Sequence, residues 1–306
     1  MIYTITMNPS IDCYMNVEKD LMENEVNRST SEVIKAGGKG INVSMILDKY
    51  EIQSTALVLL GGFTGCFIQE EIQKNANIRL ISIPIEGINR INMKVHHRNK
   101  ALCINGKGPK ANEKTMDTIF NSISYLNEKD WVLVCGSLLQ GIGEEFILKL
   151  AELVDQRKAK LVIDMESISL ELLRKCHPYL IKPNLYEFEI LMKQKFIGIE
   201  DLIRGLKECI QIGPQNVLVS LGADGAVLAT SNQIYRMTQK TINAVNKVGS
   251  GDAMLASFVG KLAKGGTFQE ALIWGGAAGS ATASTLDDIT YEMIADYVRD
   301  VKVEII

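Results

Sequence analysis

Four continuous apolar runs of strand length set the strongest limit on how this chain can fold. They are ALVLLGG (56–62), WVLVCGS (131–137), LVIDM (161–165) and NVLVSLG (216–222). Runs of this kind suit strands that are buried on both faces of a sheet. Amphipathic stretches lie between them, and residues 143–156 combine an acidic first turn with apolar side chains at helical spacing. This alternation predicts an α/β fold with a mainly parallel central sheet flanked by helices.

Two segments interrupt this alternation. Residues 11–33 are mixed and polar, and residues 88–107 show the period-two pattern of a hairpin, with Ile91, Met93 and Val95 on one face. We expect both segments to form one small β-sheet lid that projects from the main body. The predicted α/β body therefore comprises residues 1–10, 34–87 and 108–306, and the predicted lid is a discontinuous insert of residues 11–33 and 88–107. A further hairpin is expected over residues 226–238.

The composition excludes some classes of function. The 306 residues carry a formal net charge of −3, which argues against nucleic-acid binding but permits a small anionic substrate. The six cysteines are widely spaced and form no CxxC pair, which indicates a reducing compartment. The N-terminus has no signal-peptide pattern, and no apolar run is long enough to span a bilayer. We therefore expect a cytoplasmic protein with no membrane partner.

The stretch VNKVGSGDAML (245–255) places three small residues, Gly249, Ser250 and Gly251, directly before Asp252 and an apolar helix-like run. Backbone N–H groups at such a helix start bind anions. From this stretch alone, Asp252 is better explained as an ordinary residue of a first helical turn. The functional interpretation is phosphoryl transfer, in which the N–H groups hold the phosphoryl group and the carboxylate takes a proton from the attacking hydroxyl.

A second Gly-rich stretch, KAGGKGIN (35–42), precedes another helix-like segment. Its glycines permit a close approach of the backbone to a ligand, Lys39 is a candidate for binding phosphate, and Asn42 is a candidate for a sugar hydroxyl. The stretch does not fit GxxxxGK[ST], and no GxGxxG follows the first predicted strand, which weakens a nucleotide-binding P-loop and a dehydrogenase. Asp12 follows the first predicted strand, where ligands of parallel sheets bind, and it is explained equally well as a turn residue.

Two later motifs suggest the nucleotide side of a site. KPNLYEFE (182–189) places Asn184 and Glu187 three residues apart. An amide and a carboxylate at that spacing could organise Mg²⁺ through waters, and the same spacing is that of a helix capping box. SLGADG (220–225) is a strand end followed by a Gly turn, which suits either a nucleotide edge or a plain hairpin.

Together these motifs resemble the ribokinase/PfkB superfamily of sugar kinases along essentially the whole chain. VNKVGSGDAM and AGGKGINV are similar to its two signatures, and IKPNLYEFE and VSLGADGAVL to its Asn-x-x-Glu segment and its nucleotide-side turn. The combination TMNPSID, VNR, RINMK and CINGKGP resembles the 1-phosphofructokinase and tagatose-6-phosphate kinase branch. The resemblance implies a three-layer ribokinase-like fold with a small β-sheet lid.

The resemblance also implies a role for each matching residue. Asp252 is the implied catalytic base, and Gly249, Ser250 and Gly251 form the implied anion hole. The residues implied for the sugar and its phosphate are Asp12, Gly38, Lys39, Asn42, Arg90 and Ser137, with Arg28 approaching that phosphate across a dimer interface. Those implied for the nucleotide are Lys182, Asn184, Glu187, Ser220, Gly222 and Gly225, of which Asn184 and Glu187 order Mg²⁺.

The implied function is ATP-dependent phosphorylation of a ketohexose phosphate by a homodimer that associates through the lid. Fructose 1-phosphate is the predicted acceptor, and tagatose 6-phosphate and fructose 6-phosphate are alternatives. The chain departs from the branch pattern at Cys103, Leu139 and Lys247. These departures leave open a hypothesis of another class, a sugar-phosphate-binding regulator with little activity.

Overall fold

The computed structural model describes residues 1–306 apart from 19, 98–99, 112 and 246–247. In the described chain, ten strands form one large sheet in the order β14-β13-β12-β11-β10-β9-β8-β1-β4-β5. In this order across the sheet, the adjacent strands β11, β10, β9, β8, β1, β4 and β5 pair in parallel. The adjacent strands β11, β12, β13 and β14 pair antiparallel. The strands are β1 (Ile2–Thr6), β4 (Ser54–Leu60), β5 (Ile78–Pro84), β8 (Trp131–Cys135), β9 (Lys160–Asp164), β10 (Leu180–Ile181), β11 (Asn216–Ser220), β12 (Ala226–Thr230), β13 (Ile234–Gln239) and β14 (Val301–Ile305).

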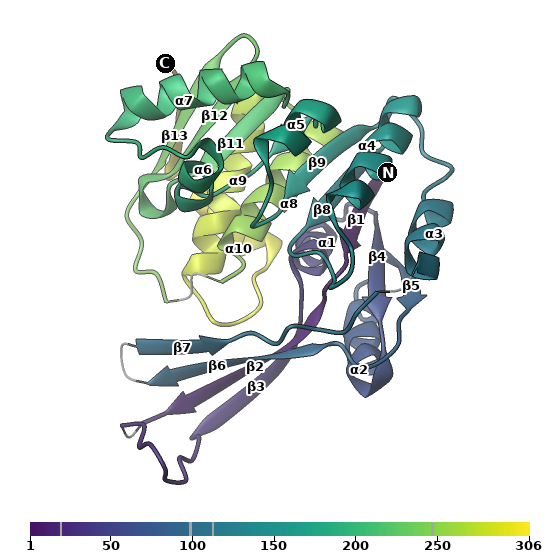
Figure 1. Ribbon diagram of the computed structural model, residues 1–306. Helices are drawn as coiled ribbons and strands as arrows, with labels where there is room; N and C mark the ends of the chain where they lie inside the picture. The colour runs from purple at the N-terminus through teal and green to yellow at the C-terminus, as the bar shows by residue number, and fades with distance from the viewer. Residues whose placement is uncertain (19, 98–99, 112, 246–247) are drawn as a thin grey trace.

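Helices cover both faces of this sheet (Figure 1), which confirms the predicted three-layer α/β fold. One face carries α3 (Glu113–Ser122), α4 (Glu144–Gln156), α5 (Leu170–Cys176), α6 (Leu185–Met192) and α7 (Ile199–Ile212). The other carries α1 (Lys39–Lys49), α2 (Gly62–Gln73), α8 (Ser250–Ala263), α9 (Phe268–Ala283) and α10 (Tyr291–Val298). A short 3₁₀ turn, η1 (Gly222–Asp224), links β11 to β12.

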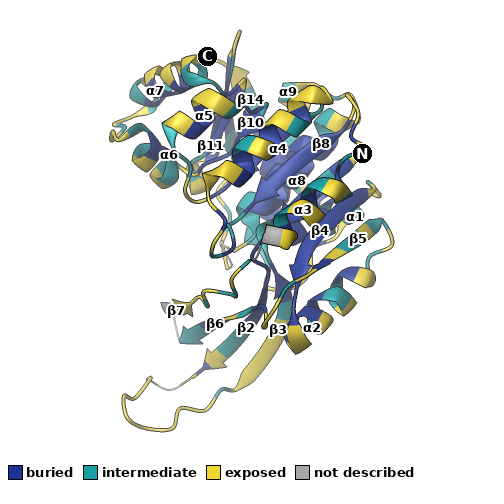
Figure 2. Cartoon of the chain, turned by 45° about the vertical axis from the view of Figure 1, so that its right-hand side comes forward, coloured by how far each residue is buried: buried dark blue, intermediate teal, exposed yellow. Residues whose placement is uncertain are grey.

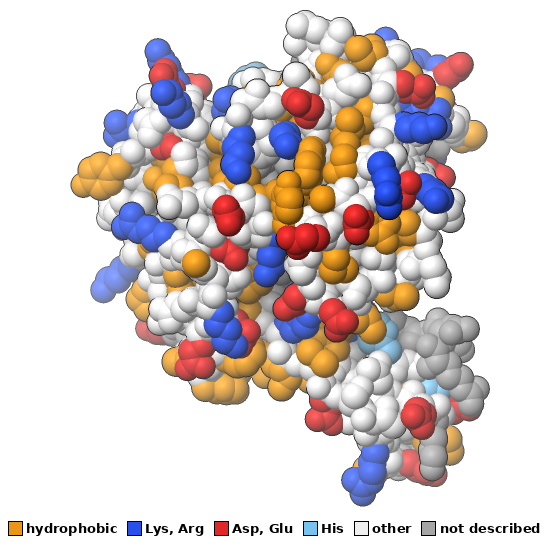
Figure 3. Space-filling model, turned by 180° about the vertical axis from the view of Figure 1, so that it is seen from behind, with side chains coloured by type: hydrophobic (Ala, Val, Ile, Leu, Met, Phe, Trp, Pro, Cys, Tyr) orange, Lys and Arg blue, Asp and Glu red, His pale blue; other side chains and the backbone are white. Residues whose placement is uncertain are grey.

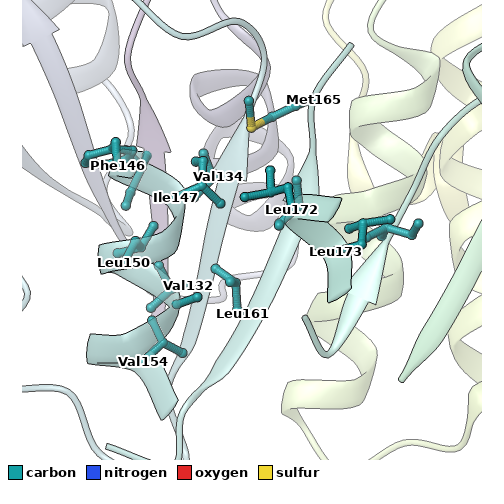
Figure 4. Packing of buried hydrophobic residues seen from close by; sticks show 14 of the residues in the cluster. Val132, Val134, Phe146, Ile147, Leu150, Val154, Leu161, Met165, Leu172 and Leu173 are labelled. Atoms are coloured by element: carbon teal, nitrogen blue, oxygen red, sulfur yellow. The ribbon is translucent and has the colours of Figure 1, made fainter. Parts of the chain in front are cut away.

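Alternation along β8 shows how a continuous apolar run serves two cores. Val132 and Val134 pack on the α4 side (Figure 4), whereas Trp131, Leu133 and Cys135 pack on the α8 and α9 side. Successive strand residues point to opposite faces, so both faces of this strand must be apolar. The predicted apolar stripe of α4 is buried at Phe146, Ile147, Leu150 and Val154.

Four further strands form a separate small sheet that projects from the main body (Figure 1). In the described residues its order is β3-β2-β6-β7, formed by β2 (Ser10–Val17), β3 (Ser31–Gly37), β6 (Arg90–His97) and β7 (Lys100–Ile104). The parallel pair of β2 with β6 joins the two segments that the sequence predicted as a lid. Figure 2 shows that its strands are more exposed than the central strands β4 and β8. We call this element the small sheet.

Charged side chains of both signs are interspersed over the face of the molecule seen in Figure 3. Within the described residues, no helix combines the length and the apolar character that crossing a membrane requires.

Candidate active site

Asp252 lies in the first turn of α8 and is buried, with 6% of its surface exposed. The residue that begins this helix, Gly249, has a positive φ of 81° and supplies no side-chain cap. The N–H groups of the first turn therefore have no capping side chain and suit an anion. Asn42 of α1 donates its Nδ2–H to Asp252 Oδ2 over 2.7 Å, so the first turns of two helices meet at this carboxylate.

Three charged residues surround Asp252. Lys39 Nζ lies 3.0 Å from Asp164 Oδ1, and Lys182 Nζ lies 3.1 Å from Asp164 Oδ2. Asp164 is the last residue of β9, and Lys182 directly follows β10, so both stand at the carboxyl ends of neighbouring parallel strands. A Cβ placed on Gly251 would lie 3.3 Å from Lys182 Nζ, which brings this ammonium group against the start of α8.

The charges in this cluster shift one another's pKa values. Burial, together with the negative charge of Asp164, raises the pKa of Asp252 to about 6. Burial alone would raise the pKa of Asp164, but Lys182 and Lys39 outweigh it and lower that pKa. Burial would likewise lower the pKa of Lys39, yet the carboxylates of Asp164 and Asp252 raise it above its usual value. Asp164 therefore stays ionised while Asp252 titrates close to neutral pH, as a general base requires.

The polar face of the small sheet holds Asp12. Its Oδ1 accepts hydrogen bonds from Ser10 Oγ at 2.7 Å and Asn92 Nδ2 at 2.8 Å, and its Oδ2 pairs with Lys94 Nζ at 2.5 Å. A Cβ on Gly37 would lie 2.7 Å from the carboxyl carbon of Asp12, so the Gly-rich segment before α1 packs directly on this acid. Gly38 follows with a φ of 134° and begins α1 without a side-chain cap.

Two of the three predicted phosphate ligands, Arg90 and Ser137, are joined through Asn8, and the third, Lys39, is paired with Asp164. Arg90 Nε donates to the main-chain oxygen of Asn8 over 3.1 Å, and Asn8 Nδ2 donates to Ser137 Oγ over 3.2 Å. Burial lowers the pKa of Arg90, while the charges of Asp12 and Glu166 act in the opposite direction. This effect of Asp12 indicates that the guanidinium lies near the polar face of the small sheet.

Asn184 and Glu187 form a complete capping box at the start of α6. Asn184 Oδ1 accepts from the Glu187 N–H at 2.9 Å, and Glu187 Oε2 accepts from the Asn184 N–H at 2.8 Å. The described residues contain no group of three or more His, Cys, Asp or Glu side chains arranged to hold a metal. The side-chain oxygens of an amide and a carboxylate are of the kind that Mg²⁺ takes as ligands, directly or through the waters that it commonly retains. The charge of Glu187 reaches Lys39, where it contributes to the raised pKa of that lysine.

The remaining nucleotide-side residues lie at the end of β11. Asn184 forms a parallel β-bridge with Ser220, which places the two motifs side by side. Gly222 and Gly225 have φ angles of 63° and 90° in the turn to β12. A Cβ on Gly225 would lie 2.0 Å from the Met237 carbonyl oxygen, so this glycine is required by the turn itself.

Within a single chain, Arg28 does not lie near the other predicted site residues. Arg28 is exposed in the segment between β2 and β3, at the end of the small sheet farthest from the main body (Figure 1). Of the departures from the branch pattern, Leu139 is buried in the core, and Cys103 is exposed opposite Lys94 in the register of β6 and β7. Lys247 lies outside the described residues.

The structure adds four residues that the sequence did not nominate: Asn8, Asn92, Lys94 and Asp164. Three of them carried a usable signal. Asn92 and Lys94 alternate with Arg90 along one strand and so share its face. Asp164 ends a buried apolar strand, where parallel sheets bind ligands. Asn8 carried none, because its contacts join segments about 80 to 130 positions apart in the chain.

Comparisons with known proteins identify the family of the chain. The model of the pfkB family carbohydrate kinases matches residues 1–292. The chain is 36% identical over 284 residues to the D-tagatose-1-phosphate kinase of Bacillus licheniformis, covering 92% of each chain. It is 34% identical over 305 residues to the 1-phosphofructokinase of Borreliella burgdorferi, covering 99% of this chain and 98% of the other. The crystal structure of phosphofructokinase-2 from Escherichia coli with substrates and products has the same fold, with a TM-score of 0.89, 24% identity and coverage of 97% and 98%. The predicted family is confirmed, and the chain belongs to the pfkB family of carbohydrate kinases.

Proposed function

We propose that this kinase transfers the terminal phosphoryl group of ATP to the free primary hydroxyl of a ketohexose phosphate and yields a bisphosphate. The observation that carries the proposal is the buried carboxylate of Asp252 at the uncapped start of α8. A hydroxyl beside this carboxylate gives up its proton as it attacks the phosphorus. The pKa of about 6 keeps Asp252 ionised at neutral pH and able to accept that proton.

The negative charge on the transferring group needs fixed positive partners. The N–H groups of Gly249, Ser250 and Gly251, together with Lys39 and Lys182, supply them around Asp252. Such preorganised donors stabilise the transition state because they need not reorganise during the reaction. Mg²⁺ bound with ATP supplies further positive charge, and Asn184 and Glu187 hold its waters. Ser220, Gly222 and Gly225 border the nucleotide.

The acceptor's own phosphate is bound by Arg90 and Ser137, and Asp12, Gly38 and Asn42 orient the sugar. Arginine suits this role because its planar fork of donors matches a phosphate. We favour a ketohexose 1-phosphate, with fructose 1-phosphate first, because three relatives at 32–36% identity are named for a ketohexose phosphorylated at carbon 1. Tagatose 6-phosphate, which carries the phosphate at the other end, becomes the weaker alternative.

The test measures ADP release from Mg-ATP with fructose 1-phosphate, tagatose 1-phosphate, tagatose 6-phosphate, fructose 6-phosphate and free fructose. We expect turnover with a ketohexose 1-phosphate. In Arg90→Ala, loss of charged hydrogen bonds should raise KM for that acceptor by about 10- to 100-fold. Arg79→Ala, which removes an exposed arginine of β5, should leave KM unchanged. Saturable binding of a sugar phosphate without ADP release would instead favour a binding protein.

We also propose that two chains associate through the small sheet. Its cross-strand register puts Asp12, Asn92 and Lys94 on one face and gathers apolar side chains on the other. The apolar face is exposed in the single chain, at Ile34 (55%), Ile91 (40%), Leu102 (50%) and Ile104 (59%). An exposed apolar face of this kind favours burial against a partner. In such a dimer the partner chain would supply Arg28 and the polar faces would close over the sugar.

Sedimentation of two variants tests the dimer. Ile104→Lys places a charge on the apolar face, so it should shift the protein to monomers. Ile197→Lys, at a position 87% exposed outside the small sheet, should leave the oligomer intact. A monomeric wild-type protein would overturn the proposal.

A further inference from the structure

Asn8 holds both proposed phosphate ligands at once. It is buried, with 6% of its surface exposed, in the connection between β1 and β2. Its Nδ2 donates to Ser137 Oγ over 3.2 Å and to the main-chain oxygen of Lys107 over 3.1 Å. Its own main-chain oxygen accepts from Arg90 Nε over 3.1 Å. One residue thus connects the small sheet, the segment after β7 and the loop after β8.

The direction of these hydrogen bonds decides which donors remain for a ligand. Ser137 Oγ accepts from Asn8, so the single hydroxyl proton of Ser137 is left to donate elsewhere. Arg90 donates its Nε–H to Asn8, so the four N–H bonds of its two terminal nitrogens can donate to a ligand. Asn8 therefore occupies one acceptor site of Ser137 Oγ and the Nε–H of Arg90. The Ser137 hydroxyl proton and the terminal N–H groups of Arg90 can still donate to a phosphate.

We propose that Asn8 is a positioning residue for the phosphate of the acceptor sugar. Its amide fixes the orientation of the Ser137 hydroxyl, and its carbonyl oxygen fixes the Arg90 guanidinium, so that the free donors of both converge on one anion. This inference rests on the proposed function, in which Arg90 and Ser137 bind that phosphate. Asn8 itself acts through these two residues.

The segment after β7 packs closely on the Asn8 side chain. A Cβ on Gly108 would lie 2.3 Å from Asn8 Oδ1, and Gly108 has a φ of 81°, so the segment after β7 closes tightly over the amide. An aspartate of the same size has no N–H to give. The Ser137 hydroxyl would then donate to that carboxylate and be lost to the ligand, and the added negative charge would repel a phosphate.

The experiment measures KM and kcat for the ketohexose phosphate that the wild-type enzyme turns over. Asn8→Ala should raise KM for the sugar phosphate by about tenfold, the value of one hydrogen bond, with kcat and the KM for ATP within twofold of wild type. Asn8→Asp, which preserves the volume, should raise the same KM by about 100-fold because it adds repulsion. In a Ser137→Ala background, Asn8→Ala should change KM for the sugar phosphate by less than a further twofold, because the hydroxyl that the Asn8 amide orients is absent.

Asn216→Ala is the matched control. Asn216 is also a buried asparagine that donates to one main-chain oxygen, that of Tyr179, so this variant should lose stability without a change in KM. If Asn8→Ala lowers kcat and raises both KM values alike, or if its effect multiplies fully with that of Ser137→Ala, the positioning role is wrong. Wild-type enzyme that turns over no ketohexose phosphate would overturn the proposed function instead, which separates the two failures.

Discussion

Helices α1 and α8 begin differently from helices α6 and α9. Gly38 and Gly249 start the first pair and offer no side chain to the N–H groups of the first turn. A capping box starts each of the second pair, at Asn184 in α6 and at Thr267 in α9. Backbone donors at a helix start must find a partner in the chain, in water or in a ligand. Three other helices, α2, α4 and α7, also begin at a glycine without a side-chain cap, so an open start alone does not mark a site. The open starts of α1 and α8 differ from these because they meet at the buried carboxylate of Asp252.

The two capping boxes teach a second point. In α9, Thr267 and Glu270 exchange hydrogen bonds with no proposed ligand nearby. In α6, Asn184 and Glu187 make the same pair of bonds next to the proposed nucleotide site. The Asn-x-x-Glu spacing is therefore satisfied by helix capping alone, and any metal role must come in addition.

The largest effect is expected from Asp252→Asn. The amide keeps the size of the side chain but cannot accept the proton of the attacking hydroxyl, so kcat should fall by about 10³-fold. ADP release under saturating substrates measures it. The melting temperature should not fall, because the variant removes a buried charge next to Asp164. Retention of more than a tenth of the wild-type kcat would show that another group takes the proton.

The open start of α8 is tested by a pair of glycines on the same helix. Gly249 has a φ of 81° before α8 and Gly265 has a φ of 86° after it, so alanine should cost about 1 kcal/mol at either position. Only Gly249→Ala should disturb the anion-binding N–H groups and lower kcat, by about 10²-fold. Urea denaturation and kcat of both variants provide the measurement. Equal kcat values in the two variants would place the anion elsewhere.

The pH dependence of kcat/KM follows from the environment of Asp252 in the free enzyme. Burial and the charge of Asp164 raise its pKa to about 6, so the carboxylate becomes protonated as the pH falls through that value. A general base is active when ionised, so kcat/KM for the sugar phosphate should be constant above about pH 7 and fall about tenfold per pH unit below the pKa. In Asn42→Ala the loss of the hydrogen bond to Asp252 should move this decline to higher pH. A profile that stays flat down to pH 5 contradicts the assignment.

The sequence could predict the parts of this molecule that local patterns determine. The apolar runs at 131–137 and 216–222 became β8 and β11, and the hairpin at 226–238 became β12 and β13. Asp252 was found because glycines before an acid and an apolar helix form a local signal. The resemblance then supplied the family, which the comparisons confirm.

The long-range pairings could not be predicted in this way. The alternation of apolar and polar residues in β2 and β6 does not predict that these strands pair in parallel. This pairing nevertheless brings Lys94 to Asp12. The same holds for Lys39 and Lys182, which come from different segments to share Asp164. Such ion pairs depend on tertiary arrangement, because a lysine shows the same local pattern whether it is exposed or bound to a buried acid.

The smallest effect, and the sharpest comparison, comes from Glu187→Gln beside Glu270→Gln. Glutamine keeps the acceptor oxygen of a capping box, so each variant loses only the favourable charge at the helix start and a small part of the unfolding free energy. The two variants should therefore be equally stable in urea. If Glu187 also holds the waters of Mg²⁺, the Mg²⁺ concentration for half-maximal activity should rise by up to about tenfold in Glu187→Gln alone. Identical Mg²⁺ curves would mean that the box in α6, like the one in α9, serves only to begin its helix.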